Sequence, residues 1–191
     1  MSYLWSFQSF DAERLVSLFA DPQGAALARL LEVVESDVDD PQDVEAATSL
    51  ARRFVAAGLS YEGLDRRESR AADDMVALIF SPEGFAEDLG VAYLSDEGMH
   101  PSDIEELIAR NPLVAVLPAL VRGRRAGQEE STQCEYCVLS PAEVASAIEE
   151  VGRAIDSPSP WSTEWAPTNA RDFLLQPLIA AGDRWVYAQL G

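Results

Sequence analysis

The chain contains no lysine, so arginine is its only strongly basic residue. Fourteen arginines stand against thirty-three aspartates and glutamates, which gives a formal net charge of −19. Binding to nucleic acid or to an anionic membrane depends on basic side chains that neutralise phosphate. The sequence therefore argues against both as partners. Two explanations of the charge stay open: an acidic surface can steer a basic protein partner toward itself, or the charge keeps the protein soluble.

Cysteine is scarce and long apolar runs are absent. Two cysteines in 191 residues are too few for a disulfide framework. The most apolar stretch, Pro112 to Val121, is half of the roughly 20 residues that span a bilayer. The first residues, MSYLWSFQSFDAER, lack the basic and apolar regions of a signal peptide. We therefore expect a cytoplasmic protein.

The overall composition is that of a globular protein. Hydrophobic residues make up 48% of the chain and charged residues 25%, which are ordinary fractions. A chain of 191 residues is long enough to bury one sizeable core. We predict a single globular domain that spans residues 1–191.

Three segments have the pattern of strands. Tyr3, Trp5 and Phe7 alternate with other residues near the N-terminus, and residues 184–190 are rich in strand formers after a Gly-Asp turn. Cys134 to Leu139, CEYCVL, is a short apolar run directly before a helix start. Most of the remaining chain has helical periodicity. We predict an α+β fold, mostly helical, with a small sheet of about three strands that includes the N- and C-terminal strands.

Helix starts and apolar stripes are visible in several places. Ser140-Pro141-Ala142-Glu143 is a capping box with proline at the first helical position, and Ser102 with Glu105 is a second candidate box. Apolar stripes at helical spacing predict core positions. They are Leu15, Val16, Leu18 and Phe19; Leu27, Leu30, Leu31 and Val34; Leu50, Phe54 and Val55; and Val144, Ile148, Val151 and Ile155. Glu149, Glu150 and Arg153 are predicted on the other face of the last of these helices. The proline-rich segment Ser157 to Asn169 predicts an ordered loop. A last helix follows from about Arg171 to Ala181, with Pro177 as a kink.

Cys134 and Cys137 form a C-x-x-C motif, and His100 is the only histidine. Redox sites of this type place the first cysteine at a helix N-terminus, whereas the cap here, Ser140, lies beyond both thiols. A structural zinc site needs four ligands, so these three residues would need an acidic fourth. We expect structural cysteines and no cofactor. The alternative is a small metal-binding protein or enzyme that uses Cys134, Cys137 and His100.

The densest run of negative charge extends from Glu35 to Glu45. A calcium loop of the EF-hand type is excluded because proline stands where that loop needs glycine. The run predicts a solvated acidic connection and a docking surface for a basic partner. Its candidate binding residues are Glu35, Asp37, Asp39, Asp40, Asp43 and Glu45.

Two tryptophans and one basic cluster are further candidates. Trp161 and Trp165 lie in the proline-rich segment, where tryptophan either closes a core or anchors a partner. Arg122, Arg124 and Arg125 form a basic cluster, and we expect a solvated helix end there. No phosphate-binding or dinucleotide-binding glycine motif occurs, so no catalytic residue is predicted.

The segment Tyr136-Cys137-Val138-Leu139-Ser140-Pro141-Ala142-Glu143-Val144 resembles the helix start of the YfbM-like bacterial family. The tryptophan-containing loop, the helix from Arg171 to Ala181 and the closing strand from Trp185 to Leu190 are also similar to that family. The resemblance implies a small bacterial α+β domain without assigned catalytic residues. It also implies an immunity-type role beside a toxin.

These observations lead to one functional hypothesis and two alternatives. The hypothesis is a non-catalytic protein-binding module, such as an immunity protein that neutralises a basic toxin. The first alternative is the metal-binding protein or enzyme described above. The second attributes the acidity to the proteome of the organism, through a GC-rich genome or adaptation to high salt.

Overall fold

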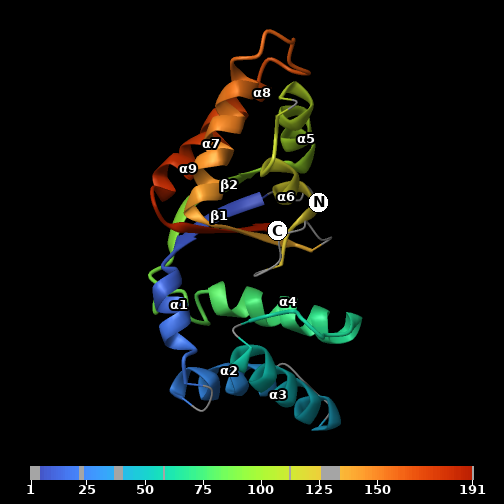
Figure 1. The fold of residues 1–191 in the computed structure, drawn as a ribbon, viewed down its shortest axis with the longest axis vertical. Helices are drawn as coiled ribbons and strands as arrows, with labels where there is room; N and C mark the ends of the chain where they lie inside the picture. Colours follow the sequence, from blue (N-terminus) through green and yellow to red (C-terminus); the bar gives the residue numbers. More distant parts are fainter. Residues whose placement is uncertain are drawn as a thin grey trace. The chain divides into compact units, whose positions relative to one another are not determined.

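The computed structural model describes residues 5–21, 24–36, 41–57, 59–111, 113–125 and 134–190. The chain is organised as two compact units (Figure 1). Unit 1 comprises Met1–Phe10 and Ala92–Gly191, and unit 2 comprises Asp11–Val91. Unit 2 is thus an insertion within unit 1. The single globular domain over residues 1–191 stays a prediction.

A four-stranded antiparallel sheet lies at the centre of unit 1. Its strands are β1 (Trp5–Phe10), β2 (Ala92–Met99), β3 (Tyr136–Leu139) and β4 (Trp185–Leu190), in the order β2-β1-β4-β3. The N- and C-terminal strands pair along their whole length, from Trp5 with Leu190 to Phe10 with Trp185. The α+β class is therefore confirmed, and so are the three predicted strands.

The sequence did not indicate β2. Its residues, AYLSDEGM, include aspartate, glutamate and glycine, which are depleted in strands. The strand lies at one edge of the sheet, where charged side chains are common because they discourage pairing with another chain. Its pairing with β1 is also irregular, with register shifts around Phe7.

Helices of unit 1 cover one face of the sheet (Figure 1). Trp5 and Phe7 of β1, and Val186 and Ala188 of β4, point into this core. Val144 and Val151 of α7 belong to the same buried cluster, so the apolar stripe predicted for that helix is confirmed. The helices are α5 (Pro101–Arg110), α6 (Leu117–Arg122), α7 (Pro141–Ile155), α8 (Ala166–Ala170), η1 (Arg171–Leu175) and α9 (Gln176–Ala181).

Two predicted helix boundaries need correction. The helix α5 begins at Pro101 with His100 as its cap, because the imidazole Nδ1 accepts from the backbone N–H of Ser102; Ser102 is therefore not the cap. The segment predicted as a loop up to Asn169 already contains α8 from Ala166. At Ser140, by contrast, both hydrogen bonds of the predicted capping box are present.

The predicted kink at Pro177 takes the form of a π-helical turn. Proline has no N–H for a carbonyl four residues earlier, and π-turns are one way in which a helix accommodates such a gap. The backbone N–H of Gln176 donates to the carbonyl of Arg171, five residues earlier. Gly182, with a φ of 63°, ends α9 as predicted.

Unit 2 is helical in its described residues. Its core holds Leu27, Leu30 and Leu31, as the sequence predicted, together with the edge-to-face pair of Phe54 and Tyr61. The stripe predicted for Leu15 to Phe19 is confirmed in part, because Phe19 is buried and Leu15 and Leu18 are half-buried, whereas Val16 is 71% exposed. The helices are α1 (Ala12–Leu18), α2 (Ala25–Ser36), α3 (Pro41–Ala56) and α4 (Arg66–Phe80). No described helix of either unit is long and apolar enough to cross a membrane.

Candidate functional site

The loop of residues 156–165, which we call the tryptophan loop, is fixed to unit 1 by a buried arginine. Arg110, in the last turn of α5, is 9% exposed. Its Nε–H donates to the carbonyl of Ala154 at 3.0 Å. Its two terminal nitrogens donate to the carbonyls of Pro160 and Ser157 at 3.1 and 3.0 Å. One guanidinium thus satisfies carbonyls at the C-terminus of α7 and holds the loop that follows.

Trp161 completes this fixation. The guanidinium carbon of Arg110 lies 3.6 Å from the centre of the Trp161 ring, which is a cation–π contact. The indole is partly buried and packs against the core of unit 1. Of the two readings of Trp161, the structure supports the core role, since one face of its ring is already occupied.

Glu106 and Thr163 fix the second half of the tryptophan loop. The backbone N–H of Ser162 donates to Oε1 of Glu106 at 2.7 Å, and the hydroxyl of Ser162 donates to Oε2. Oγ1 of Thr163 accepts from the N–H of Ala166 at 3.2 Å, which satisfies a donor in the first turn of α8. The loop is therefore held at several points along its length.

Trp165, at the end of this fixed loop, is 67% exposed. Single exposed apolar residues are common on protein surfaces and need no explanation. Trp165 differs from such a residue in two ways. It follows the exposed Glu164, and it belongs to a loop that several hydrogen bonds hold in place. Trp165 therefore exposes to solvent a large side chain of a type that is enriched at the centres of protein interfaces.

Most of the predicted acidic patch cannot be placed. Asp37, Asp39 and Asp40 lie outside the described residues, and the description does not extend to the side chains of Glu35 and Asp43. Glu45 is exposed near the beginning of α3. The patch therefore stays a prediction.

The three residues of the metal-binding alternative have separate roles. Cys137 is buried in β3 and its side chain belongs to the core of unit 1, while Cys134 precedes the strand and His100 caps α5. Burial raises the pKa of the Cys137 thiol to about 12, which is opposite to the shift that metal binding or nucleophilic attack requires. The described residues contain no group of three His, Cys, Asp or Glu side chains that could hold a metal ion.

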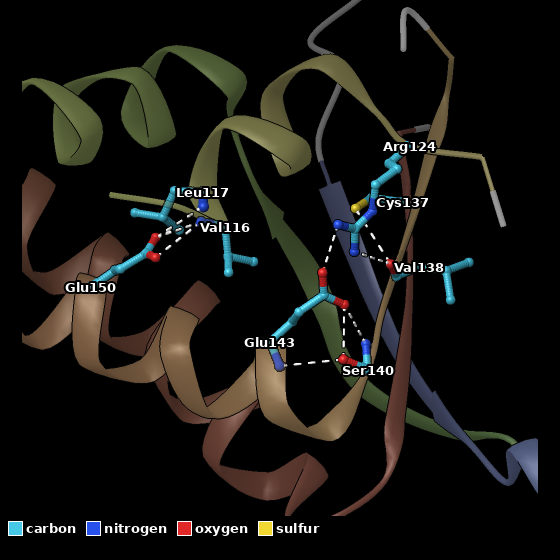
Figure 2. A network of polar contacts seen from close by, with 8 residues as sticks. All are labelled: Val116, Leu117, Arg124, Cys137, Val138, Ser140, Glu143 and Glu150. Carbon is cyan, nitrogen blue, oxygen red and sulfur yellow. Dashed lines mark hydrogen bonds and ion pairs between the residues drawn. The ribbon is translucent and has the colours of Figure 1, made fainter. Parts of the chain in front are cut away.

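A polar network joins the start of α7 to β3 (Figure 2). Arg124 forms an ion pair with Glu143 at 2.6 Å and donates to the carbonyl of Val138 at 2.7 Å. Glu143 also accepts from the N–H and the hydroxyl of Ser140. The Arg124 side chain is 11% exposed, so the prediction of a solvated basic cluster is wrong at this position.

A second network holds the start of α6 (Figure 2). Glu150 is 3% exposed and projects from the middle of α7. Its Oε1 accepts from the N–H groups of Ala115 and Val116 at 2.8 and 2.9 Å, and its Oε2 from that of Leu117 at 3.0 Å. The donors that open a helix attract an anion, and here the chain supplies that anion itself.

Sequence reasoning missed the roles of Arg110, Arg124 and Glu150. All three side chains bind backbone groups that are many residues distant, and nothing in local periodicity reveals such pairs. Glu150 was predicted on the face of its helix opposite the apolar stripe, with Glu149 and Arg153, and this prediction is wrong because Glu150 is 3% exposed.

Comparison with protein-family models, with curated proteins and with solved structures finds no match for this chain. The resemblance to the YfbM-like family accordingly stays a prediction, and function has to be inferred from the geometry and charge of the chain itself.

Proposed function

We propose that the chain is a non-catalytic binding module for a basic protein, as an immunity protein that neutralises a basic toxin would be. The observation that carries the proposal is the formal net charge of −19 on 191 residues. A charge of this size produces a surface potential of several kT, which raises the association rate with a partner of opposite charge.

The placement of the arginines supports this proposal. Arg110 is buried among carbonyls, and Arg124 is held by Glu143. On the surface, Arg29 pairs with Asp88 and Arg153 with Glu149. Each such pair is neutral, so the net negative charge is carried by the carboxylates in excess.

Glu150, Arg110 and Cys137 give no support to a catalytic alternative. Glu150 and Arg110 form hydrogen bonds with backbone groups of the chain itself. The raised pKa of the Cys137 thiol disfavours the thiolate that nucleophilic, redox or metal chemistry would use. These groups stabilise the fold, and the surface is left as the functional part.

The test is capture of partners from the lysate of the source organism at low salt, with the purified protein as bait. We expect a basic protein that is released at high salt, because screening weakens long-range attraction. The rate constant of association should fall steeply between 50 and 300 mM NaCl, on the order of tenfold. Failure to retain any basic protein at low salt would contradict the proposal.

The predicted acidic patch is tested with the same partner. Asp37, Asp39, Asp40 and Asp43 are replaced together by asparagine, and the association rate is compared with that of the wild type. The matched control replaces Glu13, Glu62, Glu83 and Glu87, which are exposed acids elsewhere in unit 2, by glutamine. A larger loss of rate for the first variant would support a role for the patch beyond net charge.

A further inference from the structure

The two tryptophans of the tryptophan loop differ in what lies on their rings. The guanidinium of Arg110 covers a face of Trp161 at 3.6 Å from the ring centre. Among the described residues, no cation and no other aromatic ring lies against Trp165. The indole of Trp161 is thus covered by a guanidinium, whereas the indole of Trp165, four residues later, is exposed to solvent.

The loop is already ordered before any partner arrives. Arg110 holds its first half through the carbonyls of Ser157 and Pro160 and the Trp161 ring, and Glu106 holds Ser162 through two hydrogen bonds. Ordering a loop on binding reduces affinity, and a loop that is fixed in advance avoids most of that cost. The backbone that carries the exposed Trp165 is therefore fixed in advance.

The charges around Trp165 indicate what it can bind. The charged side chains of the tryptophan loop, Asp156 and Glu164, are both exposed acids. The guanidinium that binds the loop, that of Arg110, is buried and donates to three carbonyls. The exposed carboxylate of Glu164, next to Trp165 in the chain, disfavours an anionic ligand at this ring. A cation is attracted both by the carboxylates and by the face of the indole, which is the best of the aromatic rings for a cation–π contact.

We propose that Trp165 is the anchor of the interface, and that an arginine of the basic partner stacks on its ring as Arg110 stacks on Trp161. The Glu164 carboxylate beside it pairs with the same guanidinium. This inference rests on the proposed function and assigns a residue to it. The net charge determines the association rate of the partner, whereas Trp165 determines its dissociation rate.

The test measures dissociation rates of the captured basic partner from surface-immobilised variants. Trp165→Leu keeps an apolar side chain but removes the ring, and Trp165→Phe keeps a weaker ring. We expect the dissociation rate to rise at least about tenfold for the leucine variant and by a smaller factor for phenylalanine, with the association rate unchanged. Val16→Ala, at an equally exposed apolar residue in unit 2, is the control and should match the wild type.

The outcomes separate the anchor from the proposed function. A leucine variant that dissociates as slowly as the wild type would overturn the anchor and leave the binding module standing. Equal dissociation rates for leucine and phenylalanine, both faster than wild type, would overturn the stacking of a cation. Failure of the wild type to retain any basic protein at low salt would overturn both. Circular dichroism confirms that each variant is folded, as expected for an exposed position.

Discussion

The carboxylate of Glu150 shows how much one buried side chain can determine at the residue scale. Both of its oxygens accept hydrogen bonds from the backbone at the start of α6. An amide in its place turns one acceptor into a donor that faces other donors. We expect Glu150→Gln to lower the free energy of unfolding by about 2–4 kcal/mol in urea denaturation. Glu149→Gln, at the exposed neighbour that pairs with Arg153, should change it by less than about 0.5 kcal/mol.

The ion pair of Glu143 predicts a contribution to stability that depends on pH. Burial by itself raises the pKa of Glu143, but hydrogen bonds from Arg124 and Ser140 outweigh it and leave the pKa below its ordinary value of 4.5. A lowered pKa in the folded state adds stability above the ordinary value, and this contribution is lost as the pH falls through the folded pKa. Between pH 6 and pH 3, the unfolding free energy of Glu143→Gln should therefore fall less steeply than that of the wild type. Parallel curves would contradict the assignment.

The thiol of Cys137 should be inert in the folded protein. A pKa raised to about 12 leaves almost no thiolate at pH 8, and the side chain is buried. We expect Cys134→Ser to show no reaction with a disulfide reagent until denaturant is added. Cys137→Ser, which retains the partly exposed Cys134, should react without denaturant.

Two glycines lead to opposite predictions at the scale of the secondary-structure element. A methyl group on Gly152, in α7, would meet no atom within 4 Å, and glycine is a poor helix former. On Gly123, whose φ is 71°, a Cβ would lie 2.1 Å from the carbonyl oxygen of Cys134. Thermal melts should therefore show Gly152→Ala stabilised by about 0.5–1 kcal/mol and Gly123→Ala destabilised by more than that. Equal effects would show that the close approach at Gly123 is relieved at little cost.

How far an element could be predicted depended on where its contacts lie. The strands β1 and β4 are central in the sheet, so their apolar patterns are strong and the sequence predicted both. The acidic edge strand β2 has no such pattern and was missed. The tryptophan loop was recognised as ordered but not as fixed by Arg110, since that residue lies 44 positions before the Ala154 carbonyl it binds. Contacts of this range leave no trace in local periodicity.

At the scale of the whole molecule, the net charge of −19 predicts how stability responds to salt. Repulsion among carboxylates is screened over about 10 Å at 0.1 M salt and over about 3 Å at 1 M. We expect the melting temperature to rise between 0.01 and 0.3 M KCl and then to level off. A rise that continued to molar KCl would favour adaptation to high salt as the origin of the acidity, in place of partner recognition.

The connection between β1 and β2 has a consequence for the architecture. Ser9 of β1 pairs with Ala92 of β2, and paired residues of antiparallel strands lie about 4.5–5.5 Å apart. The chain therefore leaves the sheet for unit 2 and returns to it at neighbouring positions, where a two-residue turn would suffice to join the strands. Unit 2 is therefore inserted at the position of the turn of the β1–β2 hairpin of unit 1. Insertions are tolerated best at such turn positions, so we expect the pairing of β1 with β2 to be kept when the length of unit 2 is changed.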